Sequence, residues 1–307
     1  MPPRSSRSCL LPGTGRQFAK LVRVGCALSG LLCAGCDVVR TGFMNAAGPV
    51  ATGERQLFLI VVGVMVVVIL PVLLLAPLFA WHYRLANTHR AYRPNWSFSW
   101  PLEVLIWVPP SLIVVALAVL LWVRARQFDP YRALPSAVPA LEVQAVALDW
   151  KWLFIYPQEQ IATLNELDIP AGRPVHITLT SGTVMQSLFV PQLAGQIYAM
   201  AGMSTQLNFA ADRPGTFIGL NTQYNGTGFS HDRFNVIALP AADYDRWLLR
   251  VRNARHPLDG TAYSGLFDRT IEVRPVLFSS VEDGLFARIL ARTGAEHSMT
   301  QRADRRP

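Results

Sequence analysis

The chain has 307 residues, enough for one membrane-embedded unit and one sandwich-sized domain. Its hydrophobic content of 51% is high for a soluble protein, and charged residues make up only 16%. The formal net charge of +8 would suggest nucleic-acid binding, but five basic residues and no acidic residue precede Cys36. Without that leader the net charge is about +3, so a nucleic-acid-binding function loses its main support.

Residues 1–35 have the order of a secretory signal, with a basic stretch followed by a short apolar run. The run ends in Leu32-Cys33-Ala34-Gly35-Cys36, which resembles a bacterial lipobox. In that pattern Cys36 is lipidated and becomes the new N-terminus, so that 36–55 follow as a periplasmic segment. Cys33 departs from the pattern, which prefers Leu. The alternative is an ordinary apolar leader with an incidental cysteine.

Two apolar segments, 56–81 and 102–124, are each long enough to cross a bilayer of about 30 Å. The loop between them, 82–101, has three arginines and no acid, which favours the cytoplasm. This signal is weak because arginines also follow the second span. An exported N-terminus decides the orientation and places 125–307 in the periplasm. Both spans contain internal prolines, so we expect them to pack against other helices.

Glu103 is the one acidic residue in a predicted span, about one turn inside the second helix. A carboxylate within the membrane is costly and is therefore a candidate functional residue. The alternative is that Glu103 lies at the interface and reaches water. The chemistry of the residue alone leaves both interpretations open.

The region 125–240 contains many short segments of β-branched and alternating apolar residues, separated by Gly, Pro, Asn and Asp. This pattern predicts an antiparallel β-sandwich. The predicted strands are 141–148, 151–156, 163–169, 175–180, 187–190, 205–210, 216–220 and 234–239.

The C-terminal part has a different pattern, and 241–293 is predicted to form a helical extension. Its two amphipathic helices cover 241–252 and 281–291, and the polar and basic segment 294–307 is predicted to fray as a tail. All four cysteines lie within the first 36 residues, so the β region can form neither a disulfide nor a thiolate-bound metal site.

Several stretches in order resemble subunit II of the haem–copper respiratory oxidases. They are the start of the second span, Leu102-Glu-Val-Leu-Ile-Trp107, then Asp149-Trp-Lys-Trp-Leu-Phe-Ile-Tyr156, Ser187-Leu-Phe-Val-Pro-Gln-Leu193, Gln196-Ile-Tyr-Ala-Met-Ala-Gly-Met203 and Pro214-Gly-Thr216. The resemblance covers roughly 50–240. It implies a two-helix transmembrane hairpin followed by a cupredoxin-like Greek-key β-sandwich.

In the cytochrome c oxidase branch of that family, this sandwich holds a binuclear copper centre. The matching positions here lack its His, Cys and Met ligands; they are Gln186, Asn221, Gln223, Asn225, Phe229 and Asp232. Copper of this type needs soft sulfur ligands, so we expect no metal in this chain. His231 lies off the pattern, and Met185, Met200 and Met203 are predicted to be packing residues.

The resemblance therefore points to the cytochrome bo-type ubiquinol oxidase branch, whose subunit II is also a lipoprotein. It implies a non-catalytic subunit in the bacterial inner membrane, with the haems and copper in subunit I. Smaller membrane subunits complete the complex, which oxidises ubiquinol, reduces oxygen to water and pumps protons. Glu103 would stand at the entrance of a proton-conducting channel. Trp150 and Trp152 would be core or subunit-contact residues.

Two alternatives belong to other classes. The first is a copper-bearing subunit II of cytochrome c oxidase, against which the lack of cysteines after Cys36 speaks. The second is a membrane-tethered binding lipoprotein without an oxidase partner, which would purify alone.

Overall fold

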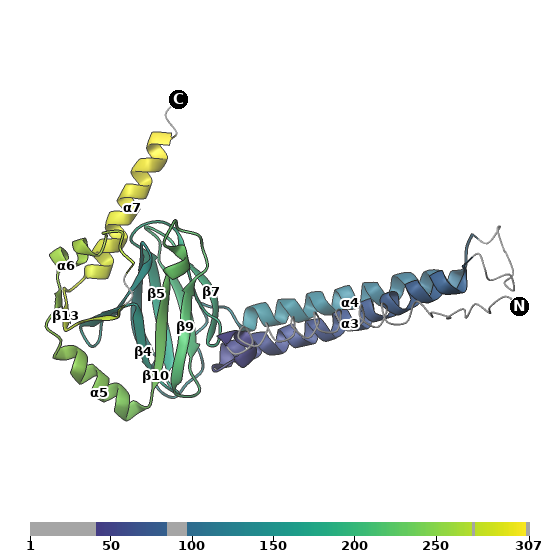
Figure 1. The fold of residues 1–307 in the computed structure, drawn as a ribbon, viewed down its shortest axis with the longest axis horizontal. Helices are drawn as coiled ribbons and strands as arrows, with labels where there is room; N and C mark the ends of the chain where they lie inside the picture. The colour runs from purple at the N-terminus through teal and green to yellow at the C-terminus, as the bar shows by residue number, and fades with distance from the viewer. Residues whose placement is uncertain (1–40, 85–96, 272–273, 305–307) are drawn as a thin grey trace, which may run out of the picture.

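A computed structural model describes residues 41–84, 97–271 and 274–304. Two long helices lie side by side and lead into a β-sandwich, and the C-terminal helices lie on the far side of that sandwich (Figure 1). The predicted fold class, a helical hairpin followed by a cupredoxin-like sandwich and a short helical extension, is confirmed.

The two apolar segments are the central parts of longer helices, α3 (Pro49–His82) and α4 (Trp100–Gln127). A 3-10 turn, η1 (Phe43–Asn45), precedes them. Helix α3 begins before the predicted residue 56 because hydropathy marks only the lipid-compatible part of a helix. Pro49 lies in the first turn, where a missing N–H leaves no hydrogen bond unmade. Both helices are long and apolar enough to span a membrane.

The sandwich consists of two sheets. The larger has the order β12-β3-β2-β1-β5-β8, with bounds Val276–Phe278, Ile161–Leu164, Lys151–Tyr156, Leu141–Leu148, Pro174–Ser181 and Thr205–Ala210. The second has the order β4-β10-β9-β6-β7, with bounds Glu166–Pro170, Arg233–Leu239, Gly215–Asn221, Gln186–Val190 and Ala194–Ala199. Strands β1 and β5, and β10 and β4, pair in parallel, so the sheets are mixed rather than antiparallel throughout.

Aromatic residues of β2 fill the space between the sheets. Trp152 and Phe154 are fully buried and stack at 6.4 Å, and both rings contact Phe234 of β10 at 5.7 and 5.1 Å. Such contacts fix the distance between the two sheets. The prediction that Trp152 is a core residue is confirmed.

The segment 163–169 was predicted as one strand, and this is wrong. Asn165 has a left-handed backbone (φ 58°) and divides the segment into β3 and β4, which belong to different sheets. Strand β7 was not predicted at all. Met185 and Met203 are 43% and 54% exposed, so they do not pack in the core of this chain.

The extension starts with α5 (Ala241–Arg252), as predicted, and continues through β11 (Pro257–Leu258) and α6 (Gly260–Gly265). The second predicted helix is present, but it begins four residues later than the predicted residue 281 and continues into the segment that was predicted to fray. Residues Ser280–Val281 form strand β13, which pairs with β11, and a single helix, α7, runs from Leu285 to Asp304. The extension also supplies β12, which pairs with β3 and completes the larger sheet.

Candidate functional site

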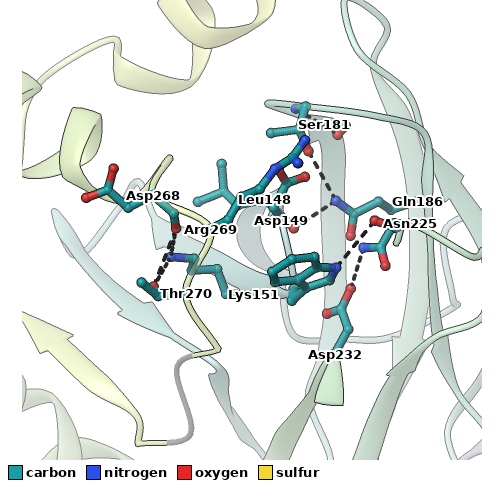
Figure 2. Close-up of polar contacts among 12 residues, drawn as sticks. Leu148, Asp149, Lys151, Ser181, Gln186, Asn225, Asp232, Asp268, Arg269 and Thr270 are labelled. Carbon is teal, nitrogen blue, oxygen red and sulfur yellow. Dashed lines mark hydrogen bonds and ion pairs between the residues drawn. The ribbon is translucent and has the colours of Figure 1, made fainter. Parts of the chain in front are cut away.

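Four of the positions that match the family's copper ligands converge at one end of the sandwich. Gln186 begins β6, Asn221 ends β9, Asn225 lies in the following loop, and Asp232 directly precedes β10. Figure 2 shows Gln186, Asn225 and Asp232 pointing toward one another beside the β1–β2 turn. The structure therefore brings together side chains that are up to 46 residues apart in the sequence.

Asp232 is the acceptor at the centre of this group, and its side chain is buried (1% exposed). Its Oδ2 accepts hydrogen bonds from the amide nitrogens of Asn221 at 2.8 Å and Asn225 at 2.9 Å. Gln186 donates to the carbonyl of Leu148 at 2.8 Å, which joins the group to the end of β1. We call Gln186, Asn221, Asn225 and Asp232 the amide–carboxylate cluster.

Burial raises the pKa of Asp232 from its ordinary value of 3.8 to about 6, because removal from water disfavours the charged form. The amide donors of Asn221 and Asn225 oppose this rise, and the charge of Asp149 adds to it. The cluster therefore contains one carboxyl group that can hold a proton close to neutral pH.

The other two matching positions do not join the cluster through their side chains. Gln223 contributes its backbone N–H, which donates to Asn221 Oδ1 at 3.0 Å. The ring of Phe229 packs against Tyr224, with centroids 5.7 Å apart. His231 is exposed, and its ring Nδ1 lies 3.1 Å from the hydroxyl of Ser230.

Trp150 covers the loop that carries Asn225. It adopts a left-handed backbone (φ 64°) in the β1–β2 turn, and its indole N–H donates to the carbonyl of Asn225 at 3.3 Å. Gly228 lies directly under the ring, where a Cβ would come within 2.1 Å of Trp150 Cδ2. The close approach of loop and ring therefore requires a glycine at this position.

The C-terminal extension is attached to the same turn. Lys151 is only 2% exposed, and its ammonium donates to the carbonyl of Asp268 and the hydroxyl of Thr270, each at 2.8 Å. Arg269 pairs with Asp149 at 3.0 Å (Figure 2). This attachment was not predicted, although a lysine within the apolar stretch Trp150–Tyr156 was a signal that a polar partner exists.

The donors of the amide–carboxylate cluster do not fit a binuclear copper centre. They are amides and one carboxylate, joined by hydrogen bonds to one another and to neighbouring backbone groups. Two buried oxygens, Asn225 Oδ1 and Asp232 Oδ1, have no partner among the described residues. The described residues contain no group of three or more His, Cys, Asp or Glu side chains that could hold a metal ion. Copper centres of this kind depend on thiolate and imidazole, so no step of a reaction is assigned to copper here.

Glu103 lies far from this cluster, in the first turn of α4 at the opposite end of the hairpin (Figure 1). Its carboxylate accepts a hydrogen bond from the indole of Trp107 at 3.1 Å. At 1.5 Å per residue, about 36 Å of helix separate it from the sandwich end of α4. Cys36 lies outside the described residues.

Comparison with known proteins agrees with this arrangement. The family model "Cytochrome C oxidase subunit II, periplasmic domain" matches residues 141–238. The chain is 41% identical over 262 residues to "Cytochrome bo(3) ubiquinol oxidase subunit 2" of Pseudomonas aeruginosa, covering 85% of this chain and 78% of that protein. The chain belongs to the ubiquinol oxidase subunit 2 family.

Two further members show the extent of the similarity. "Ubiquinol oxidase subunit 2" of Acetobacter aceti is 40% identical over 278 residues, which cover 90% of this chain and 89% of that protein. The Buchnera aphidicola protein named "Cytochrome bo(3) ubiquinol oxidase subunit 2" is 33% identical over 86% of this chain and 91% of its own length. Membership of the ubiquinol oxidase subunit 2 family, together with the cluster's donor set, disfavours the copper-bearing alternative.

Proposed function

We propose that this chain is the non-catalytic subunit II of a proton-translocating ubiquinol oxidase. The observation that carries the proposal is the amide–carboxylate cluster, which occupies the family's copper positions with side chains bonded to one another. A sandwich without a redox centre cannot relay electrons from a soluble donor. Electrons would therefore reach the haems and copper of subunit I from ubiquinol in the membrane, and this chain would bind no metal.

In this proposal the sandwich has a structural role beside subunit I. The hydrogen bonds around Asp232 hold the 221–232 loop in shape, which is what a metal centre would otherwise do. The attachment of Lys151 to the extension fixes the adjoining turn from the other side. Both sets of contacts make this end of the sandwich rigid, and a rigid surface suits a permanent subunit contact.

The hairpin supports a second role at its opposite end. We assign Glu103 to the entrance of a proton-conducting channel that leads into subunit I. Its carboxylate lies at the start of a membrane-length helix, where it can exchange protons with water and face a larger partner. Trp107 holds one carboxylate oxygen and so limits the positions that the side chain can take.

The orientation and anchoring follow from the leader. Lipidation of Cys36 and two membrane crossings would place the sandwich in the periplasm and the 82–101 loop in the cytoplasm of a bacterium. Helix surfaces that are exposed along α3 and α4 would contact lipid, subunit I and the smaller membrane subunits.

The decisive experiment is purification of the tagged chain from its host membranes with a mild detergent. We expect a haem-containing multispanning subunit to co-purify and the complex to oxidise ubiquinol with oxygen consumption. The separated chain should contain no stoichiometric copper. Purification of the chain alone would overturn the proposal, as would a purple copper spectrum from the sandwich.

A further inference from the structure

A cavity of about 300 Å³ lies at the junction between the helical hairpin and the sandwich. Its walls come from the first turns of α3, the end of α4, the connector up to Pro135, and strands β7 and β8. Among the residues that line it are Glu54, Phe128, Arg132 and Gly195.

The walls of this cavity are held in place by contacts among its lining residues and their neighbours. Phe128 packs against Gly53, where a Cβ would meet its ring at 2.1 Å. Asn208 donates from both its backbone and its side-chain nitrogen to the carbonyl of Pro130, at 3.0 and 2.9 Å. Ala47 bridges the carbonyl of Gln192 and the N–H of Asp212, each at 2.8 Å. The cavity therefore exists before any ligand arrives.

Three charged residues line this cavity: Glu54, Asp129 and Arg132. Asp129 Oδ1 accepts a hydrogen bond from the backbone N–H of Tyr131 at 2.9 Å, which leaves Glu54 and Arg132 as two opposite charges whose side chains are not paired among the described residues. Glu54 is half-buried, and its carboxylate uses the space that Gly195 leaves free, since a Cβ there would lie 2.7 Å from Oε1. Arg132 lines the same cavity from the connector. Within the described part of the chain, neither side chain makes a hydrogen bond or an ion pair. A partly buried carboxylate without a partner is costly, so both charges suit a ligand that carries both signs.

The cavity lies one turn beyond the apolar surface of the hairpin. Helix α3 has no charged residue from Gln56 to Trp81, and Arg124 is the first charge at this end of α4. Arg126 stacks over Trp122 at 4.3 Å, which is typical of a membrane interface. In a bilayer that covers the apolar surface, Glu54 and Arg132 would stand at the level of the lipid headgroups.

We propose that this cavity binds the headgroup of a phosphatidylethanolamine-type phospholipid. The primary ammonium would donate to Glu54, the phosphate would accept from Arg132, and the acyl chains would lie along α3 and α4. A choline headgroup fits less well, because a quaternary ammonium donates no hydrogen bond and prefers an aromatic cage. Phe128 is the one aromatic residue in the cavity's lining, and Gly53 lies against its ring. The inference needs only that the hairpin spans a bilayer, and it goes beyond the role of the chain in the oxidase.

Native mass spectrometry can test this with the full chain, together with any subunits that co-purify. The delipidated protein in detergent would be titrated with phosphatidylethanolamine, phosphatidylcholine and phosphatidylglycerol. We expect the wild type to bind one phosphatidylethanolamine at least about tenfold more tightly than the other two, as a charged hydrogen bond typically provides. Glu54→Gln should remove this preference, and Arg132→Gln should weaken all three lipids.

Asp245→Asn is the matched control, since it removes an exposed carboxylate from α5, far from the cavity, and should leave lipid binding unchanged. Equal binding of the three lipids by the wild type would overturn the proposal, and so would a preference that survives in Glu54→Gln. A zero-length amide cross-link between Glu54 and a lysine of a co-purifying subunit would also overturn it, because a protein cation would then be the partner. Thermal unfolding of each variant shows whether it is folded.

Discussion

The titration of Asp232 makes a quantitative prediction about stability. Its pKa of about 6 in the folded chain lies about two units above the ordinary 3.8. For a raised carboxyl pKa, the stabilising contribution is complete below pH 3.8 and is lost as the pH rises through 6. The total loss is about 3 kcal/mol, of which about 2 kcal/mol falls between pH 4.5 and 8.

Asp232→Asn removes this titration while it keeps an oxygen that can accept from Asn221 and Asn225. The free energy of unfolding of the wild type should therefore fall relative to that of the variant by about 2 kcal/mol between pH 4.5 and 8. Urea unfolding of the sandwich in the detergent-solubilised full chain, followed by near-UV circular dichroism, measures this difference.

The pH dependence of the unfolding free energy has to be taken as the difference between the wild type and Asp232→Asn, because a second buried carboxyl group also titrates. Asp168 is also buried, and desolvation together with the neighbouring Glu166 raises its pKa to about 8. Its contribution is the same in both chains and cancels. Asp245→Asn, on the surface of α5, should follow the wild-type curve. Parallel pH profiles for the wild type and Asp232→Asn would refute the reasoning.

Three further changes test other contacts. Lys151→Met should destabilise the chain by about 2–3 kcal/mol and make the extension more sensitive to limited proteolysis, because a buried charged hydrogen-bond donor is lost; unaltered cleavage would contradict the attachment. Gly228→Ala should cost about 1–3 kcal/mol in urea unfolding through overlap with Trp150, whereas Gly265→Ala, with open space around it, should be nearly neutral. Glu103→Gln should slow ubiquinol oxidase turnover with haem content unchanged, and full turnover would remove its proposed role.

The strands that were predicted well are those in which the side-chain types alone indicate which residues are buried. The stretch 151–156 is apolar and aromatic apart from Lys151, and it is buried on both faces as β2. Strand β7 was missed because it contains Gly195 and because its four central positions are exposed or half-buried, with only Ala194 and Ala199 buried. The break at Asn165 could not be predicted either, since a single left-handed residue turned an apparently continuous strand from one sheet into the other.

The positions of the site residues were predicted from the sequence, whereas the hydrogen bonds between them became known only from the structure. The family motif located Gln186, Asn221 and Asp232, but their hydrogen bonds depend on how the loop returns to the start of β10. Nothing in the local sequence indicated that Lys151 would meet the segment 268–270, which lies more than 100 residues further along the chain.

The pairing of β12 with β3 has a consequence for biosynthesis. The edge of the larger sheet stays open until residue 278 has left the ribosome, although the other five strands are complete by residue 210. An open strand edge is a template for association with another chain. Nascent copies, and copies that terminate before residue 276, should therefore be more prone to aggregate than the longer chain, because the edge at β3 is uncovered in them.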